Sequence, residues 1–149
     1  MRAWYVAKLK SGQEKTAKNN LLRQEFTTYV PYVYAKKKHR NIEPMFPGYG
    51  FVNLSDEEGD WSVIRSTVGV IGLVKFGERP AAISEDVIEH LISRENEEGL
   101  HGEAHEYKAG DRVQIESGPF RFYEAVIQSH RNQRITLLIE MMGQSMTLE

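Results

Sequence analysis

Residues 44–52 read Pro44-Met45-Phe46-Pro47-Gly48-Tyr49-Gly50-Phe51-Val52, and the rest of the chain is organised around this stretch. Pro47-Gly48 predicts a turn, because proline fixes φ and glycine tolerates positive φ. Residues 49–54 then predict a strand, which places Tyr49 and Phe51 on one face and the aliphatic side chains on the other. The aromatic face and Phe46 form a second apolar surface. Either another layer of the same domain or another protein has to cover it.

The composition is that of an ordinary globular protein. The chain has 149 residues, enough for one domain or two small ones, of which 40% are hydrophobic and 27% charged. No apolar run approaches the ~20 residues of a spanning helix, and the first residues lack the apolar core of a signal peptide. We therefore expect a cytoplasmic protein. The absence of cysteine excludes disulfides and thiol chemistry.

The charge is unevenly distributed along the chain. Residues 1–80 carry 13 Lys and Arg against 8 Asp and Glu, whereas residues 81–149 carry 6 against 13. The first part is thus net +5 and the second net −7. Only the first part suits contact with a polyanion such as a nucleic acid.

The pattern of residues 1–94 predicts an α+β domain of order β-α-β-β-α-β-α. We expect an antiparallel sheet with helices on one face. Asp60 is the expected N-cap of the second helix and Ser84 that of the third. The expected strands cover residues 3–9, 27–34, 49–54 and 70–76, and the expected helices residues 13–26, 61–66 and 82–94.

Beyond residue 94 the composition changes twice. Residues 95–106 contain five glutamates and two glycines and predict an acidic flexible linker. Short strands over residues 111–115, 125–128, 134–140 and 145–148 predict a small β-barrel. Residues 135–142 also contain good helix formers, so a helical state of the tail is the alternative. We expect the barrel, because Gly118-Pro119 and Gly143 interrupt helices.

These residues carry a resemblance to a known family. The chain resembles the NusG family of transcription elongation factors, and within it the specialised RfaH-like paralogues. The resemblance implies an NGN domain over residues 1–94, a linker over residues 95–106 and a KOW domain over residues 107–149. It rests on Trp4-Tyr5-Val6, Phe46–Tyr49, Trp61–Ser66, Arg79-Pro80-Ala81, Gly110–Val113 and Ser117–Phe120.

The resemblance also implies the binding residues. An apolar depression of the family's NGN domain takes the tip of the clamp helices of RNA polymerase, and large rigid aromatics suit such a contact. In RfaH-like proteins a polar helix face reads the non-template DNA strand, through side chains that reach base edges and phosphates. The matching positions for polymerase are Phe46, Pro47, Tyr49 and Phe51, and those for DNA are Lys10, Asn20, Arg23, Gln24 and Thr67.

The family's KOW domain binds a ribosomal small-subunit protein or the termination factor Rho. Its matching positions are Phe120, Tyr123, Met141 and Met142. The cationic run Lys36–Arg40 predicts an exposed loop or hairpin tip, with phosphate contact as a second possibility. No nucleophile constellation, phosphate loop or metal-ligand spacing is present in the sequence, although His101 and His105 would lie four residues apart on a helix. We expect neither enzymatic activity nor a cofactor.

The sequence therefore predicts a monomeric elongation or antitermination factor. It would bind RNA polymerase and non-template DNA and suppress pausing or termination. One alternative is a housekeeping NusG-type factor that assists Rho. The other is a stand-alone RNA-binding module, which would expose stacking aromatics on the face of its sheet.

Overall fold

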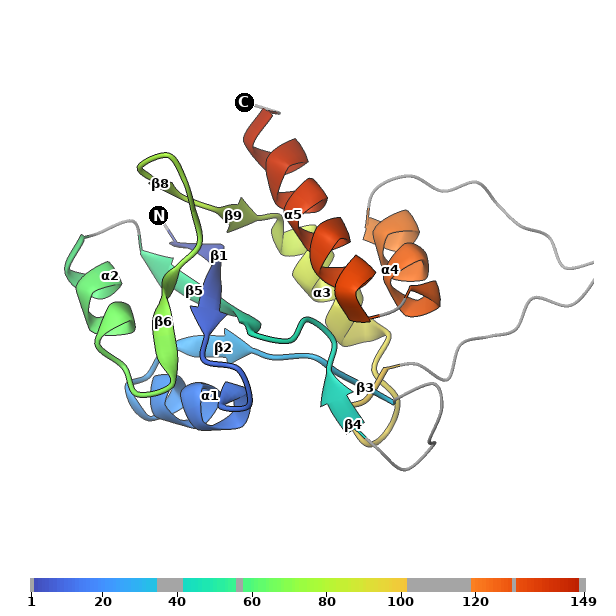
Figure 1. Cartoon of the computed structure of the whole chain (residues 1–149), viewed down its shortest axis with the longest axis horizontal. Helices are drawn as coiled ribbons and strands as arrows, with labels where there is room; N and C mark the ends of the chain where they lie inside the picture. The colour runs from blue at the N-terminus through green and yellow to red at the C-terminus, as the bar shows by residue number, and fades with distance from the viewer. Residues whose placement is uncertain (1, 35–41, 56–57, 102–118, 130, 148–149) are drawn as a thin grey trace, which may run out of the picture.

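The computed structural model describes residues 2–34, 42–55, 58–101, 119–129 and 131–147. Its main sheet has the strand order β2-β5-β1-β6, and β9 pairs with β1 beyond this path (Figure 1). All of these pairings are antiparallel. The expected α+β class and the order of the main elements are confirmed. The strands are β1 (Arg2–Leu9), β2 (Thr27–Tyr29), β5 (Tyr49–Ser55), β6 (Val70–Leu73) and β9 (Ala82–Ile83).

The turn at the centre of the chain forms as its sequence predicts. The Tyr49 N–H donates to the Phe46 carbonyl at 3.0 Å, which closes a turn with Pro47 and Gly48 in the middle. Gly48 has φ of +82°, a conformation that favours glycine. The Gly48 carbonyl also accepts from the Leu9 N–H at 2.8 Å. The turn therefore sets the end of the β1–β5 pairing, where Lys8 lies opposite Tyr49.

Three helices belong to the first part of the chain: α1 (Glu14–Arg23), α2 (Glu58–Arg65) and α3 (Glu85–Ser93). The Ser84 hydroxyl accepts from the Asp86 N–H at 3.2 Å, so the predicted cap of α3 is confirmed. The prediction for Asp60 is wrong, because α2 already begins at Glu58. Residues 82–83 were expected in the third helix but pair with β1, which buries Ile83 in the core.

Two of the predicted strands are divided. The segment 27–34 forms β2 and β3 (Tyr32–Tyr34), which are separated at Val30-Pro31, where proline disfavours a continuous ladder. β3 pairs with β4 (Ile42–Pro44), and the run Lys36–Arg40 between them lies outside the described residues. The segment 70–76 forms β6 and β7 (Lys75–Phe76), and β7 pairs with β8 (Arg79–Pro80).

Helices cover both faces of the sheet, whereas the sequence predicted them on one face. Successive residues of a strand point to opposite faces, and both sets in β1 and β5 are apolar. Figure 1 shows α1 and α2 on one side of the sheet and α3, α4 and α5 on the other. On the first side lie Ala7, Leu9, Ala17, Leu21, Val52, Leu54 and Ile64; on the second lie Trp4, Val6, Phe46, Phe51, Val87, Ile88 and Leu91.

The tail is helical, so the expectation of a barrel is not met. It forms α4 (Pro119–Gln128) and α5 (Arg131–Thr147), the alternative state that its helix formers allow. Pro119 is the first residue of α4, a position where its missing N–H costs no helical hydrogen bond. Gly143 lies within α5 at a cost of about 1 kcal/mol relative to alanine. Packing of both helices on the sheet outweighs these local preferences. The strand predicted over 111–115 lies outside the described residues.

The first residues of the predicted linker are packed. Leu100 and His101 are buried, and the His101 N–H donates to the Tyr32 carbonyl at 2.9 Å. Asn96 shapes the preceding turn, because its side-chain oxygen accepts from the N–H groups of Glu98 and Leu100. The chain therefore remains attached to β3 up to residue 101. Residues 102–106 lie outside the described part.

Candidate functional site

The central stretch builds an aromatic cluster on one face of the sheet. Phe46 and Phe51 meet edge to face with ring centroids 5.9 Å apart, and Tyr29 stacks on Phe51 at 6.3 Å. Phe46 and Phe51 are each only 1% exposed, Pro47 is buried and Tyr49 is half-buried. The structure thus brings the four predicted polymerase-binding residues together. It also covers them.

The two tail helices make the cover. The Phe122 ring of α4 lies parallel to the Phe46 ring, at a centroid distance of 6.2 Å and an interplanar angle of 14°. Val126 of α4 and Leu138 and Met142 of α5 belong to the same core cluster, and each is fully buried. Deep burial of this kind stabilises by roughly 1.5–3 kcal/mol per large apolar side chain. The cover is therefore a true packing interface.

An ion pair connects α5 to strand β4. The Arg134 guanidinium of α5 donates to the Glu43 carboxylate of β4 at 2.6 Å. The Arg134 side chain is 6% exposed and that of Glu43 is 28% exposed, so little water screens the pair. The two residues are 91 positions apart in the chain. The pair forms only while α5 lies on the sheet.

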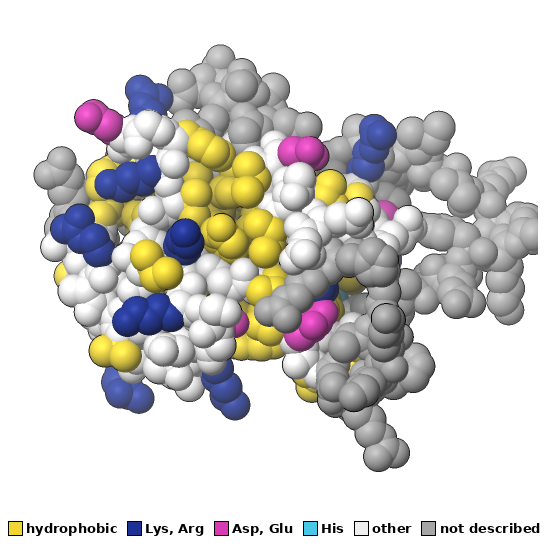
Figure 2. All heavy atoms as spheres, in the orientation of Figure 1, with side chains coloured by type: hydrophobic (Ala, Val, Ile, Leu, Met, Phe, Trp, Pro, Cys, Tyr) yellow, Lys and Arg dark blue, Asp and Glu magenta, His cyan; other side chains and the backbone are white. Residues whose placement is uncertain are grey.

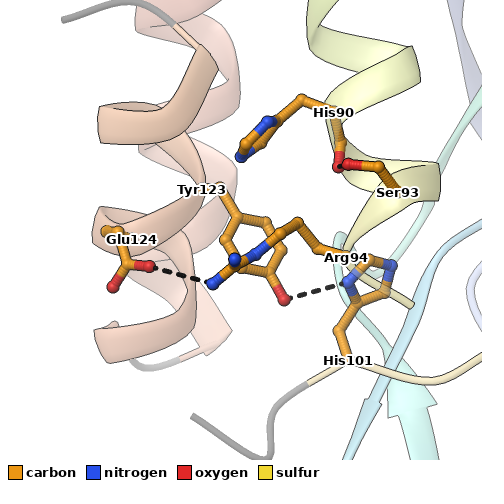
Figure 3. A network of polar contacts seen from close by, with 6 residues as sticks. All are labelled: His90, Ser93, Arg94, His101, Tyr123 and Glu124. Atoms are coloured by element: carbon orange, nitrogen blue, oxygen red, sulfur yellow. Dashed lines mark hydrogen bonds and ion pairs between the residues drawn. The ribbon is translucent and has the colours of Figure 1, made fainter. Parts of the chain in front are cut away.

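A second polar network joins α4 to the segment that follows α3 (Figure 3). His101 lies between two tyrosines, with Nε2 3.0 Å from the Tyr29 hydroxyl and Nδ1 3.2 Å from the Tyr123 hydroxyl. Burial, and secondarily the Arg94 charge, lowers the pKa of His101 to about 4. Burial is also the main cause that raises the pKa values of Tyr29 and Tyr123. The network is therefore neutral at its centre near pH 7.

A separate polar face surrounds α1. Gln24 Nε2 donates to the Thr67 hydroxyl at 2.8 Å and to the Asn20 carbonyl at 3.2 Å, and Asn20 Nδ2 donates to the Val68 carbonyl at 3.2 Å. Thr67 is buried, and its hydroxyl donates to the Val63 carbonyl at 2.8 Å. Within this network Thr67 holds the Gln24 amide in place, and its own hydroxyl points to partners inside the protein.

Lys10 and Arg23 complete this face. Both are exposed, and the Lys10 N–H donates to the Gly69 carbonyl at 2.9 Å. Gly69 has φ of +92°, and a Cβ there would lie 2.9 Å from the Ala17 nitrogen, so only glycine lets α1 approach this loop. Figure 2 shows Lys and Arg side chains spread over the part of the surface formed by α1, α2 and β6, with few carboxylates among them. Of the predicted DNA-binding residues, Lys10, Arg23 and Gln24 are thus exposed on a basic surface, whereas Thr67 lies beneath it.

Comparison with known proteins places this geometry in a family. Residues 2–92 match the family model described as "NusG: Transcription termination factor nusG", which covers more than half of the chain. The chain belongs to the NusG family. The expected resemblance is thereby confirmed at the level of the family. The expectation that the chain is not an enzyme is also borne out, because NusG proteins are transcription factors without enzymatic activity.

NusG relatives match almost the whole chain. The protein named Transcription termination/antitermination protein NusG of Thermus thermophilus is 29% identical over 98% of this chain and 93% of its own length. Proteins of the same name from Chlamydia pneumoniae and Pseudomonas aeruginosa are 26% and 24% identical. The former covers 96% of this chain and 87% of its own length, and the latter covers 99% and 94%. These relatives carry the general NusG name, so they do not distinguish an RfaH-like specialist.

A solved structure shares the NusG fold. The structure described as "Domain interaction in Thermotoga maritima NusG" has a TM-score of 0.53 and 23% identity. The match covers 80% of this chain and 75% of that one. At this identity the likeness concerns the fold alone. Among the described helices, none is long and apolar enough to cross a membrane.

Two of the predicted partner-binding residues of the tail face inward. Tyr123 and Met142 are buried in the interface, and Met141 packs partly against it. The Phe120 side chain lies outside the described part, although its backbone belongs to α4. In this NusG-family chain the candidate surfaces of the two parts therefore cover each other.

Sequence reasoning missed the polar residues of the interface. Glu43, Arg134 and Tyr29 carried no motif, and His101 was considered only as a metal ligand. Within the described residues no group of three His, Cys, Asp or Glu could hold a metal ion. The single available signal was an arginine at the start of the apolar run 135–142. Its partner could not be identified from the sequence, since it lies on a strand 91 residues away.

Proposed function

We propose that this protein is a transcription elongation and antitermination factor of RfaH-like type that binds the clamp helices of RNA polymerase through Phe46, Pro47, Tyr49 and Phe51. The observation that supports it best is the aromatic surface itself, which the chain covers with its own tail. Both faces of the sheet are apolar: α1 and α2 cover the first, whereas the second is covered by α3 together with the tail helices α4 and α5. An apolar surface that the tail uncovers needs another protein to cover it, and in the open form this protein is the polymerase.

The described form is the closed form of the factor. Opening removes α4 and α5 from the sheet and frees Tyr123, Met141 and Met142 for a second partner, either a ribosomal small-subunit protein or Rho. We assign residues 1–94 to polymerase binding, residues 95–106 to the connection and residues 107–149 to this second partner. Polymerase binds only the open form, so its apparent affinity falls by the fraction of molecules that are closed.

Charge reversal across the Glu43–Arg134 pair tests this proposal. We expect Glu43→Arg to place two cations together, to open the protein and to tighten its binding to core RNA polymerase about tenfold. This corresponds to the ~1.5 kcal/mol at the lower end for a charged hydrogen bond. The double variant Glu43→Arg with Arg134→Glu restores the pair with opposite polarity and returns the affinity toward that of the parent. The measurement is a binding titration of labelled protein with polymerase.

Two results would contradict the proposal. If neither the parent nor the single variant binds polymerase, the aromatic surface has another partner. If the single variant binds no more tightly than the parent, the tail does not compete with polymerase for this surface.

The basic face around α1 is proposed to contact non-template DNA in the same complex. Arg23 and Gln24 reach base edges, Lys10 contacts a phosphate, and Asn20 and Thr67 hold Gln24 in position. We expect Lys10→Gln to weaken binding to single-stranded DNA regardless of sequence. It also makes the slope of log K against log salt shallower by about 0.7. Fluorescence anisotropy across a salt series measures both. Arg121→Gln, at an exposed position of α4, is the control and leaves the slope unchanged.

A general NusG role is the second candidate function, because the relatives named above carry the general name. Such a factor acts on all transcripts and assists Rho. Transcription in vitro on templates with and without a chosen non-template element separates the two roles. An effect confined to one element supports the specialist, and an equal effect on all templates supports the general factor. The RNA-binding module predicts exposed stacking aromatics on the sheet, whereas Phe51 and Trp4 are buried in the described form.

A further inference from the structure

Tyr123 of α4 inserts between residues that belong to the first part of the chain. The Arg94 guanidinium carbon lies 5.2 Å above the Tyr123 ring centroid, and the His90 ring meets that ring edge to face at 5.7 Å. The Tyr123 hydroxyl lies 3.2 Å from His101 Nδ1. Arg94 also reaches Glu124 at 3.4 Å (Figure 3). We call His90, Arg94 and His101 the tyrosine socket.

The socket is held in place from its own side. The His101 N–H donates to the Tyr32 carbonyl, the His101 carbonyl accepts from the Tyr34 N–H at 3.1 Å, and Nε2 is 3.0 Å from the Tyr29 hydroxyl. His90 lies on α3, and Arg94 follows its end. None of these anchoring bonds involves α4 or α5. The anchors of His101 therefore lie on β2 and β3, and within the described residues the tail contributes Tyr123 and Glu124 to the contacts above.

Because His101 and Tyr123 are buried, each needs the other as a hydrogen-bond partner. His101 is 1% exposed and Tyr123 is 6% exposed. A neutral imidazole has one donor and one acceptor nitrogen, so one of its tyrosines accepts and the other donates. Leaving a buried polar group without a partner costs more free energy than a satisfied hydrogen bond contributes. Docking without the Tyr123 hydroxyl leaves His101 Nδ1 unsatisfied in this way.

We propose that the tyrosine socket is a polar latch, in which His101 senses whether α4 is docked and sets how much of the protein is open. The proposal rests on the proposed function in that opening uncovers the polymerase surface, but the latch itself concerns docking alone. Its polar contacts do not involve the Glu43–Arg134 pair, whereas the Tyr123 ring also belongs to the core cluster that contains Phe46 and Phe51. In the sequence, His101 directly precedes residues 102–118, which connect it to α4.

The latch also makes docking sensitive to acid. The groups that act directly on His101 are Tyr29 from β2, Tyr123 from α4 and the Arg94 charge. Beside them, Glu95 interacts with Tyr29, Glu124 with Arg94, and His90 with the Tyr123 ring. In the docked form burial, and secondarily the Arg94 charge, lowers the pKa of His101 from its ordinary 6.5 to about 4. A depressed histidine pKa stabilises the docked form fully above pH 6.5, and this contribution is lost as the pH falls toward 4. If release restores the ordinary pKa, the ratio of released to docked protein rises roughly 20-fold from pH 7 to pH 5.

The test measures docking in the full chain without polymerase. The sequence contains no cysteine, so Glu78→Cys in the turn between β7 and β8 and Glu140→Cys on α5 accept two fluorophores at exposed positions. Single-molecule energy transfer then counts docked and released molecules. Each variant is made in the parent and in a Leu138→Ala background, which weakens docking and brings the ratio into the measurable range.

We expect Tyr123→Phe to raise the ratio of released to docked protein by about threefold to tenfold, the range of one hydrogen bond. Tyr34→Phe is the matched control, because its hydroxyl contacts Glu98 away from the tail, and it leaves the ratio unchanged. His101→Gln retains polar groups but does not titrate, so most of the change between pH 7 and pH 5 disappears. The latch is overturned if Tyr123→Phe docks as well as the parent in both backgrounds, or if His101→Gln keeps the full response to pH. If the variants change docking as expected but the protein does not bind polymerase, the latch stands and only the proposed function is refuted.

Discussion

Phe51→Ala is expected to lower the free energy of unfolding by about 3–5 kcal/mol, the usual cost of removing a buried phenylalanine ring. Phe51 is 1% exposed and contacts the rings of Phe46 and Tyr29, so its removal leaves a cavity between the sheet and its helices. Because β5 pairs with both β1 and β2, the strand cannot move to fill this space without breaking ladder hydrogen bonds.

Chemical denaturation measures this effect. Ile71→Ala is the control, since Ile71 lies on β6 of the same sheet but is 49% exposed. It changes the free energy of unfolding by less than about 1 kcal/mol. A similarly small effect for Phe51→Ala would mean that the ring is not part of the core. Loss of polymerase binding by this variant is therefore interpretable only at temperatures where it remains folded.

Leu138→Asp is expected to produce the largest change in conformation. Leu138 is fully buried in the interface between α5 and the sheet, and an unpaired carboxylate there costs several kcal/mol. Release of α4 and α5 returns the carboxylate to water, so the variant relieves this cost by opening. The open protein then binds polymerase more tightly than the parent.

Ile139→Asp is a close control for this variant. It introduces the same charge into the same helix one residue later, at a side chain that is 44% exposed. It therefore leaves α4 and α5 docked. Hydrogen exchange of the α4 and α5 amides reports docking, and polymerase titration reports the functional result. Equal exchange in the two variants would contradict the described packing of α5. Faster exchange of Leu138→Asp without tighter polymerase binding would contradict the proposed competition.

Three kinds of contact hold the closed form, and they respond to different conditions. The packing of aromatic and aliphatic side chains between the tail helices and the sheet is insensitive to salt. It weakens when a substitution reduces the buried apolar area. The Glu43–Arg134 pair weakens with salt or on loss of either charge. The tyrosine socket weakens in acid. A partner that binds the tail or the linker therefore shifts the same equilibrium as one that binds the aromatic surface, in proportion to its preference for the open form.

The sequence was informative where local chemistry decides the structure. Pro47-Gly48 formed the predicted turn, and Ser84 capped α3 as expected. Asp60 does not cap α2, because the helix already begins at Glu58 and Asp60 lies within its first turn. The DNA-binding role predicted for the polar residues near α1 stays a prediction, and only the structure revealed that Thr67 is buried and hydrogen-bonded to Gln24.

By itself the sequence determined the order of the main strands and helices, the central turn and the membership of the NusG family. The tertiary structure alone decided whether residues 119–147 are helical and what lies over Phe46 and Phe51. Local preferences in residues 135–142 are nearly balanced between strand and helix, so packing against a distant surface settles the outcome. The contacts that do so join residues far apart in the chain, such as Glu43 with Arg134 and Tyr29 with His101. No local pattern encodes such pairs, since each residue on its own is an ordinary polar side chain.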